Sequence, residues 1–232
     1  MAEPLVVTDV EKQYGGLRPL RVRDLRVQAG RITMLLGFDR PAAEVFVNLI
    51  TGASLPDKGA VVSLGRPTSA IADSDDWLAF VEQFGILSDR IVLLEAMTVA
   101  QNLAISFDLD LEPVPAEIMA RVMTLAGEVG IDPASAGMRV GDAPPLLRAQ
   151  VLLGRALAFD PAILVLEHPT AQLSADDARA FASIVTNVVK HRNVTTLGLL
   201  MDEKFAKATR GRLLDWQPAT GDMKERSALR FW

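Results

Sequence analysis

The hydrophobic residues of the chain form two kinds of pattern, and the two kinds alternate along the sequence. Apolar runs of strand length lie at residues 5–8, 25–27, 31–37, 59–64, 162–166, 194–200 and 212–216. Stretches of helical character lie between several of these runs, at residues 41–50, 175–190 and 203–208. Strands that alternate with helices predict an α/β fold with a mainly parallel central sheet flanked by helices.

The middle of the chain is predicted to be helical. Helices are expected at residues 98–106, 116–129 and 144–159, and an acidic, proline-containing linker at 108–115 separates the first two. We therefore expect a helical subdomain at about residues 90–150 within a single domain of residues 1–216. Residues 217–232 form the expected C-terminal tail, whose last four residues, Leu-Arg-Phe-Trp, are suited to docking on the domain or on a partner.

Local signals support three of the helix boundaries. Pro41 is placed to open a helix, and Thr51-Gly52 is placed to end it. Asp75 or Asp76 is expected to cap a short helix around Trp77.

Composition narrows the possible functions. The chain has 24 basic and 29 acidic residues, a net charge of −5, which argues against a general nucleic-acid-binding protein. It has no cysteine and only two histidines, His168 and His191, so thiolate and histidine-rich metal sites are not expected. No targeting segment or membrane-spanning run is apparent, so we expect a cytoplasmic protein whose membrane contacts come through other subunits.

Two stretches carry the candidate chemistry. Residues 35–44 read Leu-Leu-Gly-Phe-Asp-Arg-Pro-Ala-Ala-Glu, a buried strand, a glycine turn and a helix start. Phosphate-binding loops occupy this context, because a helix N-terminus attracts anions. Residues 156–170 contain a helix end, an Asp-Pro turn, a buried strand, and then Glu167-His168-Pro169.

The second stretch resembles the region of ABC transporter ATPase subunits that runs from the signature helix through the Walker B strand. Further landmarks agree in order and spacing: Tyr14-Gly15, Thr51-Gly52, Phe84-Gly85, Leu93-Leu94, Met97-Thr98-Val99 and Asn102. The resemblance extends from about residue 5 to residue 216. It implies a P-loop-type fold with an antiparallel β region and a helical subdomain. It also implies a dimer, either with a second copy or with another ABC ATPase subunit, and a membrane permease as partner.

The phosphate loop departs from the family pattern of Gly-x4-Gly-Lys-Ser/Thr. Counted from Gly37, its last three positions hold Ala42, Ala43 and Glu44, so the phosphate-binding lysine and the Mg²⁺-binding hydroxyl are absent. Asp39 adds a second carboxylate, and Pro41 removes one backbone N–H group. Arg40 offsets part of this negative charge but does not take the lysine's position.

The other positions implied by the resemblance depart as well. Glu167 occupies the position of the family's Mg²⁺-linked aspartate. His168 occupies the position of the glutamate that polarises the attacking water. Asp89 falls on the glutamine of the glutamine loop, and Met201 on the switch histidine. The signature falls on residues 143–147, Ala-Pro-Pro-Leu-Leu, and the loop that ends in aspartate in the family ends here in Ser174.

These departures predict a pseudo-ATPase with a structural or regulatory role in a transporter assembly and little or no ATP hydrolysis. No cofactor is expected, with weak binding of ATP and Mg²⁺ as the alternative. Tyr14 occupies the position of the family's aromatic residue that stacks on adenine. It either stacks on a base or packs against the protein, and packing is favoured.

Other interpretations stay open. Arg40, Glu44, Glu167 and His168 are candidates for an unconventional nucleotide site. The domain is alternatively a docking module with no role in transport. In a minority view, Asp39, Glu44 and Glu167 converge on a divalent cation.

Overall fold

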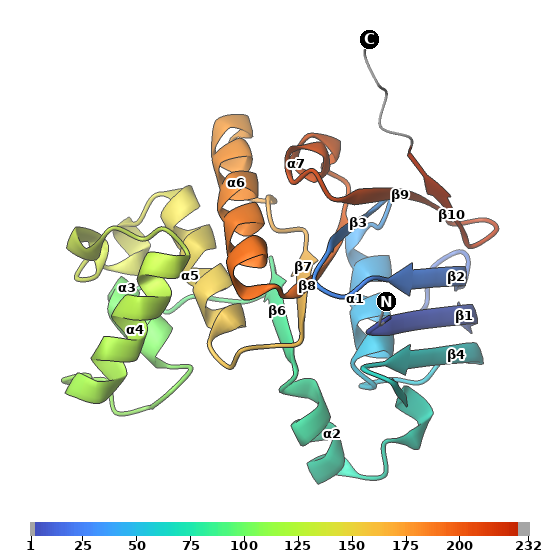
Figure 1. The fold of residues 1–232 in the computed structure, drawn as a ribbon, viewed down its shortest axis with the longest axis horizontal. Helices are drawn as coiled ribbons and strands as arrows, with labels where there is room; N and C mark the ends of the chain where they lie inside the picture. The colour runs from blue at the N-terminus through green and yellow to red at the C-terminus, as the bar shows by residue number, and fades with distance from the viewer. Residues whose placement is uncertain (1–2, 227–232) are drawn as a thin grey trace.

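Helix α1 (Arg40–Ile50) lies between two β-sheets in the computed structural model, which describes residues 3–226 (Figure 1). The smaller sheet is antiparallel, with the strand order β2-β1-β4-β5. Its strands are β1 (Leu5–Lys12), β2 (Leu20–Val27), β4 (Lys58–Ser63) and β5 (Arg66–Pro67). The C-terminal residues 229–232, whose docking was left open above, lie outside the described residues.

The larger sheet has the order β10-β9-β3-β8-β7-β6. Its strands are β3 (Ile32–Leu36), β6 (Phe84–Ser88), β7 (Ile163–Glu167), β8 (Thr195–Leu200), β9 (Arg212–Gln217) and β10 (Asp222–Glu225). All neighbours pair in parallel except β10, which pairs antiparallel with β9. The carboxyl ends of five strands therefore meet at one edge of this sheet.

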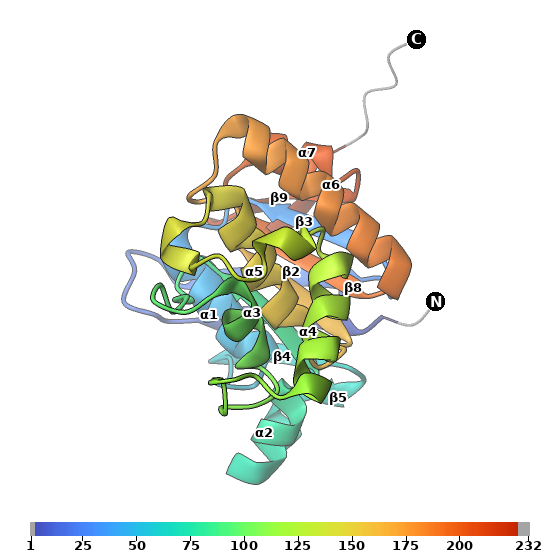
Figure 2. The same ribbon diagram turned by 90° about the vertical axis from the view of Figure 1, so that its left-hand side faces the viewer.

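The remaining helices form a cluster beside the larger sheet and a cover over one of its faces (Figures 1 and 2). The cluster contains α3 (Val99–Ala104), α4 (Ala116–Glu128) and α5 (Pro145–Leu157). The cover is made by α6 (Ala175–Arg192) and α7 (Glu203–Ala208), while α2 (Ser74–Val81) projects from the far end of the molecule. Short 3-10 turns lie at Thr68–Ala70, Pro133–Ser135 and Val140–Asp142.

Strand alternation divides the interior into two hydrophobic cores. In β7, Leu164 and Leu166 pack in the core shared with α3 to α7, whereas Ile163 and Val165 pack in the core shared with α1 and the antiparallel sheet. Successive side chains of a strand point to opposite faces, so the parity of a residue decides which core it enters. Continuing the alternation one step beyond Val165 places Glu167 on the α1 side.

The expected fold class is confirmed: a mainly parallel sheet is flanked by helices and joined by an antiparallel sheet and a helical cluster. The residue ranges are less accurate. Strands β1 and β2 extend further than the apolar runs indicated, and β6 and β10 were not predicted as strands. The expectation that β9 is the last strand is wrong, because residues 222–225 pair with it.

The cap of α2 also differs from the expectation. Asp73, rather than Asp75 or Asp76, accepts a hydrogen bond from the backbone N–H of Asp76 and caps the helix. Asp76 instead pairs with Arg66, and this hydrogen bond lowers the pKa of its carboxyl group to about 2. Among residues 3–226, no helix is long and apolar enough to cross a membrane.

The helical cluster contacts the sheet at a position that requires glycine. A Cβ atom on Gly85 in β6 would lie 2.0 Å from the carbonyl oxygen of Ala156 in α5. Both groups belong to the main chain, so neither can rotate away.

We therefore expect Gly85→Ala to lower the free energy of unfolding by at least about 1–3 kcal/mol, as overpacking does. Gly127→Ala is the matched control, because nothing lies within 4 Å of its added methyl group. In helix α4 it should raise stability by up to ~1 kcal/mol. Urea denaturation of the two variants measures both effects, and equal stabilities would contradict the packing described here.

Candidate functional site

A three-residue turn joins β3 to α1 at the carboxyl edge of the large sheet. Gly37 begins the turn with φ +97°, and its N–H donates to the carbonyl oxygen of Leu200 at 3.1 Å. A Cβ atom at this position would lie 3.2 Å from the carbonyl oxygen of Trp216. The conformation of the turn therefore accounts for this glycine, because φ in this range strains any other residue. The close approach of the Trp216 carbonyl adds to this requirement.

The second residue of the turn is part of the core. Phe38 is fully buried, and its ring stacks on Trp216 with centroids 4.2 Å apart. Its ring also lies 5.4 Å from that of Phe46 in α1. The turn is thus held by an aromatic anchor.

The first turn of α1 uses its own hydrogen-bonding groups. The helix begins at Arg40, so positions 40–42, which the family pattern assigns to the phosphate loop, are helical. The carboxylate of Asp39 accepts from the N–H of Ala42 at 2.9 Å, and the carbonyl of Asp39 accepts from the N–H of Ala43 at 2.9 Å. Pro41 has no N–H to offer. These N–H groups would otherwise attract an anion.

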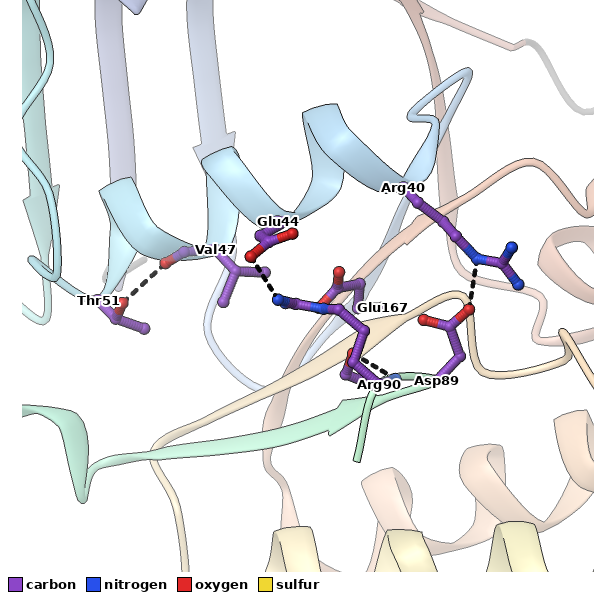
Figure 3. Close-up of polar contacts among 8 residues, drawn as sticks. Arg40, Glu44, Val47, Thr51, Asp89, Arg90 and Glu167 are labelled. Atoms are coloured by element: carbon purple, nitrogen blue, oxygen red, sulfur yellow. Dashed lines mark hydrogen bonds and ion pairs between the residues drawn. The ribbon is translucent and has the colours of Figure 1, made fainter. Parts of the chain in front are cut away.

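Two ion pairs connect α1 with the segment that follows β6 (Figure 3). Arg40 donates to Asp89 at 2.6 Å, and Arg90 lies 2.7 Å from Glu44. The second nitrogen of the Arg90 guanidinium donates to Glu167 at 2.8 Å. Arg90 therefore bridges a carboxylate of α1 and the carboxylate at the end of β7.

Of the two ion pairs of Arg90, the pair with Glu167 is the stronger, because Glu167 is shielded from solvent. The Glu167 side chain is fully buried, whereas Glu44 is 48% exposed. Burial alone would lower the pKa of the Arg90 guanidinium, but its hydrogen bond to Glu167 and the charges of Glu167, Glu44 and Asp89 raise it overall. A buried carboxylate needs such a partner, because an unpaired charge in the interior is costly.

Three buried side-chain atoms in residues 3–226 have no hydrogen-bond partner: Oδ1 of Asp89, Oε1 of Glu167 and Nε2 of His168. All three belong to the ends of β6 and β7, where Ser88 pairs with Glu167 in the strand register. The unsatisfied buried side-chain nitrogen and oxygen atoms of residues 3–226 are thus confined to this edge. Stability is commonly given up at functional sites in this way.

His168 and Met201 lie beside a second part of the edge. They line a hollow of about 490 Å³ together with Asp39, Arg40, Thr170 and Asp202. The Thr170 hydroxyl donates to Asp202 at 2.9 Å, and Met201 is 62% exposed. His168 has φ +46°, an uncommon value for a residue other than glycine, and it turns the chain directly after Glu167.

Tyr14 is partly buried against the core that contains α1. Burial, with a smaller effect from the charge of Asp39, raises the pKa of its hydroxyl group. Tyr14 therefore lies near the turn but is packed on the protein.

The structure brings together most of the residues that the sequence singled out. Arg40 pairs with Asp89, and Glu44 and Glu167 both contact Arg90. Ala43 is fully buried on the inner face of α1. Sequence reasoning missed Arg90 and Phe38. The position of Arg90 follows only once β6 is known to lie beside β7, which places residues 88–90 next to Glu167.

The residues present do not fit a divalent cation. The minority view that Asp39, Glu44 and Glu167 converge on a metal ion is wrong, because Asp39 caps α1 and a guanidinium separates the other two. Among the described residues, no group of three or more His, Cys, Asp or Glu side chains is arranged to hold a metal ion.

Comparisons with known proteins agree with this architecture. No family model matches the chain. The sulfate/thiosulfate import ATP-binding protein CysA of Thermosynechococcus vestitus is 28% identical over 208 residues, covering 87% of this chain and 58% of CysA. The Fe(3+) ions import ATP-binding protein FbpC 3 of Rhodococcus jostii is 28% identical over 214 residues, covering 92% of this chain and 59% of FbpC 3. The chain thus spans less than two thirds of the length of these curated relatives.

The dimeric structure of MJ0796, a bacterial ABC transporter cassette, matches with a TM-score of 0.75. The match covers 98% of this chain and 100% of that chain at 17% identity. The chain therefore has the fold of an ABC ATPase cassette, as the sequence predicted, and its curated relatives include ATP-binding proteins of import systems.

The aromatic anchor of the turn can be tested by stability measurements. Replacing Phe38 by alanine should lower the free energy of unfolding by about 3–5 kcal/mol, because it opens a cavity in the core. Phe159→Ala is the matched control: this ring is 63% exposed and meets Phe107 at its edge, so its loss should cost no more than about 1.5 kcal/mol. Similar losses in the two variants would show that the turn is not anchored through Phe38.

Proposed function

We propose that this chain is an ATP-binding-like subunit of an ABC-type transporter that hydrolyses little or no ATP and acts in a structural or regulatory role. One observation carries the proposal: the chain's own groups fill the N-terminal end of α1. Asp39 caps the helix, and the helix itself begins where a phosphate loop would be open.

The chemistry of phosphoryl transfer supports this proposal. The transferred phosphoryl group needs a lysine, a metal ion and backbone donors, because catalysis depends on positioning and charge stabilisation. Here the lysine position holds a buried alanine, Ala43, and the first donors are already bonded. The negative charge of Asp39 would also repel a triphosphate at the same helix end.

Similarity to ATP-binding proteins supports weak nucleotide binding as an alternative to no binding. The relatives are named as ATP-binding proteins. The hollow beside His168 and Met201 adjoins the turn, and its lining includes Arg40. Arg40 is paired with Asp89, however, and that pair would have to open before the guanidinium met a phosphate. We therefore expect ATP with Mg²⁺ to bind weakly or not at all.

The alternative function, an unconventional nucleotide-binding enzyme, has less support from the site. Arg40, Glu44 and Glu167 are each held in an ion pair, which leaves His168 as the one member of that set without a partner among the described residues. A single imidazole supplies one acid or base but no site for phosphate.

The proposed partners are a second ABC ATPase subunit, identical or different, and a membrane permease, with no nucleic acid involved. The permease would hold the chain at the inner face of the membrane. A groove of about 230 Å³ between the sheet and the helical cluster is suited to such docking, and its walls include Ile86, Ile91, Arg155 and Phe159. Arg155 also donates to the carbonyl oxygen of Val92 in the segment that follows β6.

Nucleotide binding is the direct test of the proposal. In calorimetry with millimolar ATP or ADP, with and without Mg²⁺, the purified chain should show no saturable binding or only weak binding, and it should release no phosphate from ATP. An intact ABC cassette measured in parallel controls for the assay. Tight Mg²⁺-dependent ATP binding or hydrolysis by this chain would contradict the proposed loss of activity.

Docking in the groove can be tested independently. A glutamate in place of Phe159 should reduce the amount of permease recovered with the chain, because it puts a charge on the apolar wall of the groove. Leu17→Glu is the control, since Leu17 is fully exposed and does not line the groove. If both variants recover the same amount of permease, the partner does not bind there.

A further inference from the structure

The position of Arg90 disagrees with the metal chemistry of the fold. In P-loop proteins, Mg²⁺ is held by the Ser/Thr of the loop and by the acidic residue at the end of the Walker B strand. Those two positions are occupied here by Glu44 and Glu167. The guanidinium of Arg90 lies between them, 2.7 Å from one carboxylate and 2.8 Å from the other (Figure 3).

We infer that Arg90 is a built-in cation that replaces the divalent metal ion at this edge of the sheet and fixes the segment leading into the helical cluster. This inference deepens the proposed function and rests on it for the role of the fixed segment, although the replacement itself can be tested without nucleotide.

The charges of the site support a cation that belongs to the protein. Glu167 is fully buried and carries a carboxylate that some positive group must balance. Mg²⁺ requires six oxygen ligands at about 2.0–2.1 Å in an octahedron. The guanidinium fills the space between Glu44 and Glu167 and offers planar N–H donors that match carboxylate oxygens. The ion and the guanidinium therefore exclude one another.

The local backbone places Arg90 in this position. Ser88 is the last residue of β6 and pairs with Glu167 in the neighbouring strand. The Ser88 hydroxyl oxygen then accepts from the backbone N–H of Arg90 at 3.2 Å, which turns the chain at that point. Arg90 thus starts two residues beyond the strand end, beside the carboxylate that it neutralises.

The same contacts attach the connecting segment to the sheet edge. Asp89 is bound by Arg40 of α1, and Arg90 is bound by Glu44 of α1 and Glu167 of β7. Further along, Glu95 pairs with Arg148 of α5 at 3.2 Å. Residues 89–95 are consequently held by the protein's own charges on the sheet side and on the helix side, with no requirement for nucleotide or metal.

The test compares wild type with Arg90→Gln in the absence of nucleotide, using Mn²⁺ as the probe. Removing the guanidinium should lower the melting temperature, because it leaves Glu167 buried and unpaired. Mn²⁺ should then raise the melting temperature of Arg90→Gln by several degrees, since a ligand that binds the native state stabilises it. Wild type should show no such shift. Arg148→Gln, which removes the pair with Glu95 but leaves Arg90 between the two carboxylates, should show no Mn²⁺ shift, as in wild type.

The double variant Arg90→Gln/Glu167→Gln separates the two roles of the buried carboxylate. It should recover most of the lost melting temperature and should not respond to Mn²⁺. In hydrogen exchange, amides of residues 91–98 should exchange faster in Arg90→Gln than in Arg148→Gln. If Arg90→Gln does not fold alone, Mn²⁺ added during refolding should recover folded protein.

Three results would overturn the inference: a Mn²⁺ shift in wild type equal to that in Arg90→Gln, no Mn²⁺ response or recovery in Arg90→Gln, or unchanged exchange in residues 91–98. None of them depends on whether wild type binds ATP, so a failure here is distinguishable from a failure of the proposed loss of nucleotide chemistry.

Discussion

The burial of α1 between the two sheets is the constraint on which the candidate site depends. Ala42, Ala43, Phe46, Val47, Leu49 and Ile50 all enter one core, together with residues of both sheets. This packing fixes the helix axis, so the N-terminus of α1 and the outward-facing Glu44 have fixed positions relative to the ends of β6 and β7. Apolar burial is the main source of stability for this arrangement.

In the proposed function, with the helix fixed, two charges of the protein take the places of two charges that the fold otherwise receives from outside. The carboxylate of Asp39 caps the helix N-terminus, where a phosphate would otherwise bind. The guanidinium of Arg90 neutralises Glu167 where a metal ion would otherwise lie. Each replacement satisfies a local requirement, namely orphan N–H groups in one case and a buried carboxylate in the other. Three buried side-chain atoms of residues 3–226 still lack partners at this edge: one oxygen each of Asp89 and Glu167, and Nε2 of His168.

The sequence predicted the parts of this structure that depend on local pattern. Apolar runs located β3, β7 and β8. Helical spacing located α1, α6 and α7 to within a few residues, with end signals for α1. Strand β6 (Phe84–Ser88) was missed, and its first two residues, Phe84-Gly85, were interpreted only as a landmark near the glutamine loop. Strand β10 was missed because its pairing with β9 compensates for a polar sequence, which no local pattern reveals.

The candidate site could be predicted only in part, for a related reason. The residue types at positions 39, 44, 89 and 167 were visible in the sequence, but their partners depend on strand order. Arg90 and Glu167 are 77 residues apart, and their contact requires that β6 and β7 be neighbours in register. Phe38 read as one residue of a loop, whereas Trp216, from the other end of the chain, makes it part of the core. A loop that anchors a core cannot change freely, so once Phe38 and Trp216 stack, the turn keeps its shape whether or not the residues beyond it bind phosphate. This separation of shape from chemistry explains how the fold of an ATP-binding cassette can persist around a site whose charges are supplied by the protein.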